Sequence, residues 1–471
     1  MGTAGLEAYQ VHGGGEAVAE KFASYFEGDA KGQLDHYDGN DDLLIAYDTN
    51  YMPGNDSDAI SFGFPKSGGG APGARTIERP ESAYVWGAFT AAADLYEMAG
   101  VGEAKVAELR DTADRMQAAI LDRLWSEETR MFLAGTSHGA TSAATANGQA
   151  NPLSPAERDL VPAKETNLYD VYAEEVIPFD RADTYVDGYR FLRYGDNHPI
   201  FPFYTANQYD RAKFGIGGSN NFSNINFTVQ YRGVRAGLRH YDTQQKYLDG
   251  DYAARLLDWM AWSIYPNGDA SNANQAEYYS NWNPATKTYG RNNPNHVMLG
   301  NMNYIFIEDM GGIQPRSDGS IELWPIDLGY GHFMVNNLRY HGRDVTIVWD
   351  PDGSHYGLGT GYSLFLDGER VASADRLGHF TYDPNTNKVT QAEDGLDVTV
   401  HAGATSTLAS AVDTDIEDAR VIDYLKKAGI DLERSTANLA TGATATADHT
   451  QQGSRPTPWR QFHTPGSRPV P

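Results

Sequence analysis

The hydrophobic periodicity of this chain changes once, near Gly311, and this change constrains the fold more than any other feature. Before it, apolar residues recur at helical spacing, most clearly over 103–124. After it, they alternate with polar residues in short runs that are separated by turns such as DPDG and DPNTN. The sequence therefore predicts a mostly helical domain over 1–311, followed by a small β-sandwich over 312–410.

Individual elements follow from the same patterns. The segments 81–100 and 102–125 are predicted to form a helical hairpin, because Gly100 suits the C-cap of the first helix. Between 126 and 218 the chain is rich in Pro, Asp, Asn and aromatic residues, as in long loops that line a site. Further helices are predicted over 14–27, 222–241, 251–265 and 295–310, and strands over 321–326, 332–340, 344–350, 361–372 and 396–403.

The C-terminal part is predicted to hold a helical linker over 411–434 and a low-complexity tail over 435–471, which is poor in apolar residues. The stretch NLATGATATA in this tail is similar to the first strand of a galactose-binding-like module. We therefore expect the tail to be the start of such a module, and the sequence to be truncated at both ends.

Charge and composition exclude several classes of function. The formal net charge of -26 repels phosphate backbones and anionic lipid, so we expect no nucleic-acid partner. The absence of cysteine excludes disulfides, thiolate metal sites and a cysteine nucleophile. No apolar run is long enough to span a bilayer, and the N-terminal stretch lacks the pattern of a signal peptide. We expect a secreted bacterial protein whose signal peptide lies outside this sequence.

Aromatic residues point to a carbohydrate ligand. The chain has 29 Tyr and 8 Trp among many Asn, Gly and Asp residues. Aromatic rings stack on the C–H faces of sugars, while amides and carboxylates bind hydroxyl groups. The same composition also fits an ordinary acidic protein rich in tyrosine. Sequence motifs are therefore needed to distinguish a carbohydrate-binding protein from such a protein.

The first motif is EYYSNWNPATKTYG, which places Glu277 beside Tyr278, Tyr279 and Trp282 between two predicted helices. A carboxylate among aromatic residues can act as a general base while the rings hold a sugar. The motif resembles a stretch of glycoside hydrolase family 63 and its mannosylglycerate-hydrolase-like relatives. This resemblance implies that Glu277 is the base that activates water.

Two further segments resemble the same family in the same order. The segment 219–241 is similar to a family helix that follows a Gly-Pro-Val-Trp-x-Asn-x-Asn pattern, and it supplies Phe222, Asn224 and Asn226 as candidate sugar-binding residues. The segments 79–100 and 107–133 resemble a helical pair of the family and supply Trp86 as a pocket wall. The resemblance implies an (α/α)6 toroid, or six-hairpin glycosidase fold, with some helices missing here.

The catalytic acid of the family is an Asp that precedes this helical pair. The sequence there, LLIAYDTNYMPGNDSDAISFGFP, lacks the Glu-Ser-Gly lead-in of the family motif. By position Asp58 fits the acid best, Asp56 is second and Asp48 third. Both Asp56 and Asp58 also suit turns in a polar loop, and Glu277 can also be a structural hydrogen-bond acceptor.

Other acidic residues lack a motif that fixes a role. Glu78, Glu165 and Asp196 are candidate pocket residues, whereas Glu81 is expected at a helix start, where a carboxylate complements the dipole. The acidic run over 35–42 lacks the calcium-loop pattern, and no histidine pair has the spacing of a zinc site. No metal and no cofactor are predicted.

These observations together predict a glycoside hydrolase that removes a terminal sugar from an oligosaccharide or polysaccharide with inversion. Two acids are needed, because one protonates the leaving oxygen while the other activates water on the opposite face of the ring. Two alternatives stay open. One is a polysaccharide lyase or phosphorylase on the same fold, since fold alone does not fix function. The other is a noncatalytic carbohydrate-binding protein, which the incomplete acid motif favours.

Overall fold

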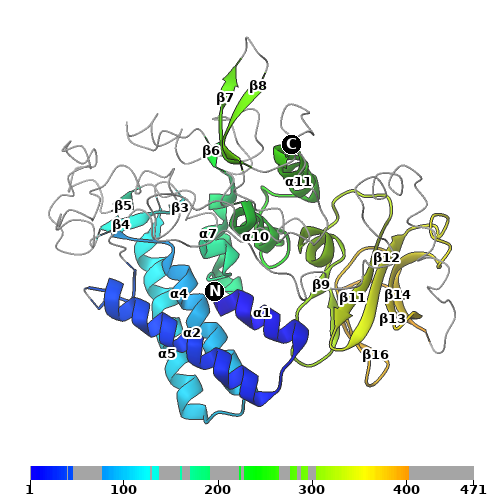
Figure 1. Cartoon of the computed structure of the whole chain (residues 1–471), viewed down its shortest axis with the longest axis horizontal. Helices are drawn as coiled ribbons and strands as arrows, with labels where there is room; N and C mark the ends of the chain where they lie inside the picture. Colours follow the sequence, from blue (N-terminus) through cyan, green and yellow to red (C-terminus); the bar gives the residue numbers. More distant parts are fainter. Residues whose placement is uncertain are drawn as a thin grey trace, which may run out of the picture. The chain divides into compact units, whose positions relative to one another are not determined.

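The computed structural model describes residues 2–39, 41–45, 77–127, 130–136, 160–161, 170–190, 222–223, 227–264, 276–283, 288–294 and 304–401 (Figure 1). All of them belong to one compact unit, Met1–Ser406. The predicted linker over 411–434 and tail over 435–471 lie outside the described residues. The predicted domain boundaries therefore stay predictions.

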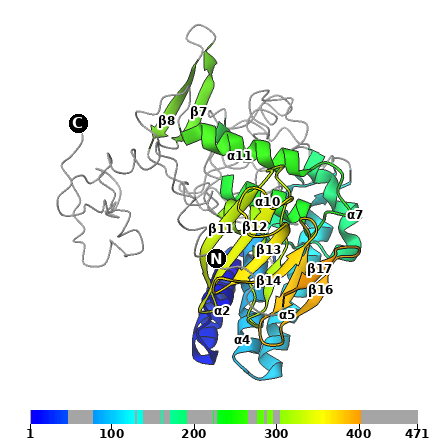
Figure 2. The same ribbon diagram turned by 90° about the vertical axis from the view of Figure 1, so that its right-hand side faces the viewer.

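Within the described N-terminal residues, four helices pack side by side (Figures 1 and 2): α1 Gly2–His12, α2 Glu16–Tyr37, α4 Ser82–Met98 and α5 Glu103–Leu124. Helix α4 is buried on most sides because α1, α2 and α5 all contact it. The predicted hairpin of α4 and α5 is confirmed. Gly100 ends α4 with a φ of 66°, a left-handed conformation that glycine adopts without strain.

Helix α2 confirms the predicted helix over 14–27 and continues to Tyr37. Its buried residues are Ala19, Ala23 and Ala30, whereas Tyr25 is 62% exposed. The small alanine side chains let the backbone of α2 approach α4 closely. The spacing of apolar residues over 14–27 thus located the helix correctly. Its buried face, however, is formed by alanine residues, and Tyr25 lies on the exposed side.

Further helices are η3 Phe179–Arg181, α7 Ala182–Tyr185, η4 Val186–Tyr189, α10 Phe227–Leu238, α11 Gly250–Ile264 and the π-helix η7 Ile305–Met310. The predicted helix over 251–265 is confirmed. The predicted helix over 222–241 is wrong at its start, where Phe222–Ser223 form strand β6. Of the predicted helix over 295–310, the described residues form η7, whose wider turns depart from an α-helix.

A buried tyrosine cluster joins these helices. Tyr172 lies 4.3 Å from Tyr189 and 6.4 Å from Tyr241, measured between ring centroids. Each hydroxyl donates to a backbone carbonyl: Tyr172 to Tyr185, Tyr189 to Gly233 and Tyr241 to Ile177. Tyrosine can occupy a core when its hydroxyl finds such an acceptor. Part of the region predicted as loops is therefore hydrophobic core.

Three small antiparallel sheets lie outside the C-terminal strands. One contains β1 Ile77–Glu78, β4 Ala134–Thr136 and β5 Leu160–Val161, in the order β1-β4-β5. The second pairs β2 Trp125–Ser126 with β3 Met131–Phe132. The third contains β6 Phe222–Ser223, β7 Ala276–Asn283 and β8 Thr288–Pro294, in the order β6-β7-β8.

The C-terminal strands form two antiparallel sheets, as the alternating pattern predicted (Figure 2). Tyr362 of one sheet contacts Phe380 of the other, with ring centroids 6.0 Å apart. The turns DPDG and DPNTN lie between strands, and the hairpin around DPNTN adds two strands that the alternating pattern did not predict. One sheet has the order β16-β15-β10-β9, with β9 Ile313–Gln314, β10 Ile321–Leu323, β15 Phe380–Asp383 and β16 Lys388–Ala392. The other has the order β11-β12-β13-β14-β17, with β11 Phe333–Tyr340, β12 Arg343–Asp350, β13 Gly361–Leu366, β14 Glu369–Ala374 and β17 Val398–Val400.

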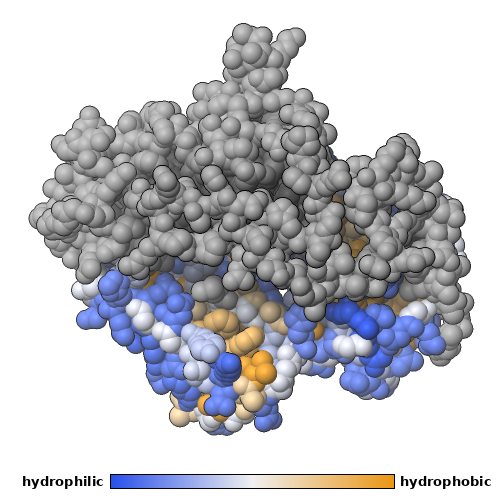
Figure 3. All heavy atoms as spheres, viewed as in Figure 1, coloured by the Kyte–Doolittle hydropathy of each residue, from blue (hydrophilic) through white to orange (hydrophobic). Residues whose placement is uncertain are grey.

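Arg239, directly after α10, connects the helices to the strands. Its guanidinium donates to the carbonyl of Trp324 at 2.8 Å and also contacts the carbonyl of Glu308. The helical and strand residues belong to one hydrophobic cluster. In the view of Figure 3 the exposed surface of the described residues is mainly hydrophilic, with a smaller apolar area over the helices.

Among the described residues the two larger antiparallel sheets follow the helices, as predicted, whereas the three small sheets within 77–294 were not predicted. The predicted ring of six helical hairpins stays a prediction. Within the part of the chain that the structure describes, no helix is long and apolar enough to cross a membrane.

Candidate functional site

The predicted catalytic residues are only partly within the described chain. Asp48, Asp56 and Asp58 lie outside it, as do Asn224 and Asn226. The further acidic candidates Glu165 and Asp196 also lie outside it. These assignments remain predictions.

Glu277 lies in strand β7 together with Tyr278, Tyr279 and Trp282. The motif was predicted to lie between two helices and no strand was predicted there, whereas the structure shows that it forms one. The aromatic residues of AEYYSNWN favour extended structure, because they fit a pleated surface.

The register of this sheet brings two of the predicted motifs together. Phe222 of β6 is the partner of Tyr279 in β7, and Ser223 is the partner of Tyr278. On the other side, Tyr279 is opposite Arg291 of β8. The pairing of β7 with β8 shifts between Tyr279 and Trp282, as at a β-bulge. Residues 57 positions apart in the sequence, Phe222 and Tyr279, are thus neighbours in the backbone.

Trp86 lies in α4 and is partly buried against the hydrophobic core. Its carbonyl accepts a hydrogen bond from the Thr90 hydroxyl at 3.1 Å, a common bond within a helix. The described contacts of Trp86 are thus structural. Its predicted role as a pocket wall stays a prediction.

Buried carboxylates surround the start of α4. Glu78 and Glu81 are each 1% exposed, and Glu81 directly precedes the helix, as predicted. Glu78 pairs with Arg123 at 2.9 Å, and Glu81 pairs with Arg79 at 3.3 Å. Buried charges need such partners, because an isolated buried carboxylate is costly. These two candidates therefore hold the start of α4 in place.

A second pair of buried acids, Asp170 and Glu174, faces the first turns of α4. Burial, and then these two carboxylates, raise the pKa of Tyr84 well above its usual range. Glu174 pairs with Arg232 of α10 at 3.2 Å. Its carboxylate lies against Gly87 of α4, where a Cβ atom would require the carboxylate to shift.

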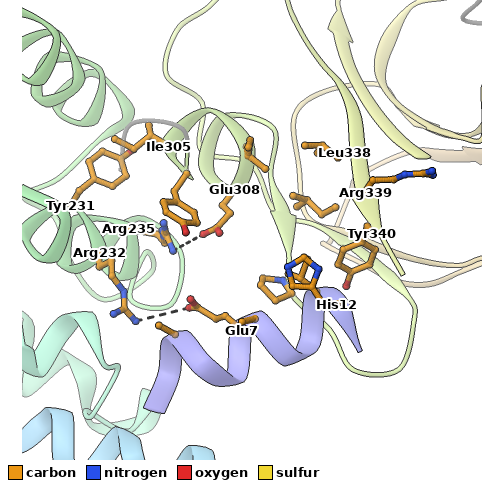
Figure 4. A pocket seen from close by; sticks show the side chains of 17 residues that line it. Glu7, His12, Tyr231, Arg232, Arg235, Ile305, Glu308, Leu338, Arg339 and Tyr340 are labelled. Carbon is orange, nitrogen blue, oxygen red and sulfur yellow. Dashed lines mark ion pairs between the residues drawn. The ribbon is translucent and has the colours of Figure 1, made fainter. Parts of the chain in front are cut away.

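A cavity of about 450 Å³ lies between α1, α10, η7, β9 and β11 (Figure 4). Figure 4 shows an ion pair between Arg235 and Glu308 and another between Arg232 and Glu7. The rest of the wall is mainly apolar. The lining residues are Ala4, Glu7, Ala8, Val11, His12, Tyr231, Arg232, Arg235, Tyr304, Ile305, Ile307, Glu308, Ile313, Pro315, Leu338, Arg339 and Tyr340.

Of the carboxyl groups that line this cavity, Glu308 has the pKa that departs most from its ordinary value. Burial raises its pKa to about 7, the nearby Arg235 guanidinium opposes this shift, and the negative charges of Glu7 and Asp309 add to it. The adjacent Asp309 is fully buried and lies 2.8 Å from Arg235 and 2.9 Å from Arg239. Asp309 therefore shares the positive charge of Arg235 with Glu308.

The sequence does not predict this cavity, although two signals indicate buried charged residues beside it. Arg232, Arg235 and Arg239 have the spacing of one helix face in an otherwise apolar segment. The adjacent acids Glu308 and Asp309 interrupt the apolar run IFIEDM. Charged residues in apolar runs indicate buried partners of opposite charge.

Among the described residues, no group of three or more His, Asp and Glu side chains could hold a metal ion. In the acidic run over 35–42, the carboxylate of Asp38 accepts hydrogen bonds from the backbone N–H groups of Asp42 and Leu43. Asp38 thus acts as a turn residue.

No family model matches this chain. Its structure is similar to that of a protein named as a sialidase, with a TM-score of 0.59 and 15% identity. The match covers 83% of this chain and 33% of the other, so the chain spans about a third of that protein. This likeness concerns the fold alone.

Two rhamnosidases also match, more weakly. A GH78 family rhamnosidase of Bacillus sp. GL1 has a TM-score of 0.47 and 14% identity over 78% of this chain and 31% of its own. An alpha-L-rhamnosidase of Dictyoglomus thermophilum has a TM-score of 0.43 and 14% identity over 84% of this chain and 37% of its own. Similarity to glycoside hydrolase family 63 in particular stays a prediction.

Proposed function

We propose that this chain is part of a glycoside hydrolase that releases a terminal sugar with inversion. The observation that carries the proposal is the likeness in fold, at a TM-score of 0.59, to a protein named as a sialidase, which is an enzyme that cleaves glycosidic bonds. The pairing of β6 with β7 supports it, because it joins two of the segments that resemble family 63. The proposed substrate is an extracellular oligosaccharide or polysaccharide.

In this proposal Glu277 is the general base and Asp58 or Asp56 the general acid. An inverting enzyme holds two carboxyl groups roughly 6.5–9.5 Å apart, which leaves room for a water molecule beside the sugar. The acid must be protonated at the working pH, which requires a raised pKa. Phe222, Asn224, Asn226, Tyr278, Tyr279, Trp282 and Trp86 are the proposed sugar-binding residues.

The test is hydrolysis of a panel of aryl glycosides and oligosaccharides by the wild type and by Glu277→Gln, Asp58→Asn and Asp56→Asn. Loss of a catalytic base is expected to lower kcat about 10³-fold, because the Gln side chain cannot accept the proton from water. Of the two Asp variants, only that of the acid is expected to show a comparable loss. Glu369→Gln, at an exposed position of β14, is the matched control and should keep full activity.

Two outcomes would contradict parts of the proposal. If Glu277→Gln keeps the wild-type rate, Glu277 is not the base. If the wild type binds sugars but hydrolyses none of the panel, the chain is a noncatalytic carbohydrate-binding protein.

A further inference from the structure

Glu174 is a buried carboxylate at a point where three helices meet. It is 8% exposed, and its two oxygens contact different helices. Oε1 lies 3.2 Å from a guanidinium nitrogen of Arg232 in α10, whereas Oε2 accepts a hydrogen bond from the Thr3 hydroxyl of α1. The same Oε2 lies against Gly87 of α4. One carboxylate therefore joins α1, α4 and α10.

The contacts of Glu174 fall near the beginnings of α4 and α10. Gly87 is the sixth residue of α4, and Arg232 is the sixth residue of α10. Gly87 directly follows Trp86, and Asn226 directly precedes the first residue of α10. Trp86 and Asn226 are both proposed sugar-binding residues. Glu174 thus links the two helix beginnings at which proposed sugar-binding residues lie.

The partly buried Arg232 has Glu174 as its nearer carboxylate. Glu7 of α1 lies 4.0 Å from Arg232, compared with 3.2 Å for Glu174. A buried charge that loses its partner is costly, because neither water nor another charge replaces the lost contact. If Glu174 loses its charge, the beginning of α10 is therefore expected to move away from α4 until water reaches the Arg232 guanidinium.

We propose that Glu174 is a positioning residue, which holds the beginning of α10 against α4 through Arg232 and so fixes Trp86 relative to the segment 222–226. This inference rests on the proposed function, because these residues are proposed to bind the sugar. Glu277 lies in β7, whose longer pairing is with β8. Its position is therefore expected to depend less on Glu174, so sugar binding should suffer more than the chemical step.

The first test compares the wild type, Glu174→Gln and Glu175→Gln in the hydrolysis of an aryl glycoside. Glu175→Gln removes the same charge at the adjacent, exposed position and is the matched control, which should change neither KM nor kcat. For Glu174→Gln, KM is expected to rise about tenfold, as for about one lost hydrogen bond to the sugar, while kcat stays within about twofold. A merely structural role would lower the folded fraction, which reduces the apparent kcat and leaves KM unchanged.

A second measurement follows the proposed pocket wall without hydrolysis. The chain is labelled with fluorotryptophan, and the fluorine NMR line of Trp86 is identified by its loss in Trp86→Phe. This line is expected to shift in Glu174→Gln, because the carboxylate lies against the residue that follows Trp86. Arg232→Met, which removes the other partner of the ion pair, should shift it as well, whereas Glu175→Gln should leave it in place.

The outcomes separate this proposal from the proposed function. The proposal is overturned if an active Glu174→Gln keeps the wild-type KM, or if the Trp86 line is the same in Glu174→Gln and Glu175→Gln. A wild type that hydrolyses no glycoside contradicts the proposed function instead. The fluorine line of Trp86 then decides alone whether Glu174 positions this residue.

Discussion

The raised pKa of Glu308 predicts how stability depends on pH. In the unfolded chain this carboxyl ionises near its ordinary pKa of 4.5, whereas in the folded protein burial raises the pKa to about 7. Between these values the folded state binds more protons than the unfolded state. Stability therefore falls as pH rises through this window. Glutamine at position 308 resembles the protonated carboxyl and removes this dependence.

The magnitude follows from the two pKa values. One pKa unit corresponds to about 1.4 kcal/mol, so the wild type should lose about 2.5 kcal/mol relative to Glu308→Gln between pH 5 and pH 8. The side chain is only 16% exposed, so solvent screens this effect little. The assay is urea unfolding of both proteins at pH 5, 6, 7 and 8. A difference between the two proteins that does not change with pH would show that the pKa of Glu308 is not raised in the folded protein.

Three further substitutions are checked by the same urea unfolding at pH 7. Gly250→Ala should lower the free energy of unfolding by about 1–3 kcal/mol, because a Cβ at this first residue of α11 would clash with the carbonyl oxygen of Asp327. An unchanged urea midpoint would contradict the close packing of α11 against Asp327. Gly32→Ala should raise the free energy of unfolding by about 0.5–1 kcal/mol, because residue 32 lies inside α2 with open space around it. A lower free energy of unfolding would contradict this prediction. Asp309→Asn should cost about 3–5 kcal/mol, because it leaves the buried Arg239 without its carboxylate and leaves Arg235 with Glu308 alone. The exposed Asp111→Asn is its control and should show no measurable change.

The sequence predicted those elements that depend on local patterns. The hairpin of α4 and α5 and the strands after Gly311 follow from apolar spacing and from turn residues, which act over a few positions. The strand β7 was missed, although its aromatic residues favour extended structure, because the motif was interpreted only through its resemblance to a family segment. A helix was predicted over 295–310, but its π-helical form over Ile305–Met310 was not, because π-helical turns have no distinct sequence pattern.

The cavity could not be predicted from the sequence, because its charged groups come from distant segments. Glu7, Arg235 and Glu308 are brought together only by the packing of α1, α10 and η7. The spacing of the arginines in α10 shows that they share a face, but it does not show which acids face them. The raised pKa of Glu308 likewise depends on burial, which local sequence does not fix.

The central claim is hydrolysis of a glycosidic bond with inversion, and NMR of the first sugar released tests it most directly. The substrate is the best aryl glycoside of the panel, compared between the wild type and Glu277→Gln. The account predicts that the wild type releases the anomer opposite in configuration to the substrate and that the variant releases sugar about 10³-fold more slowly. Release of the anomer with retained configuration, or equal rates in both proteins, would contradict it.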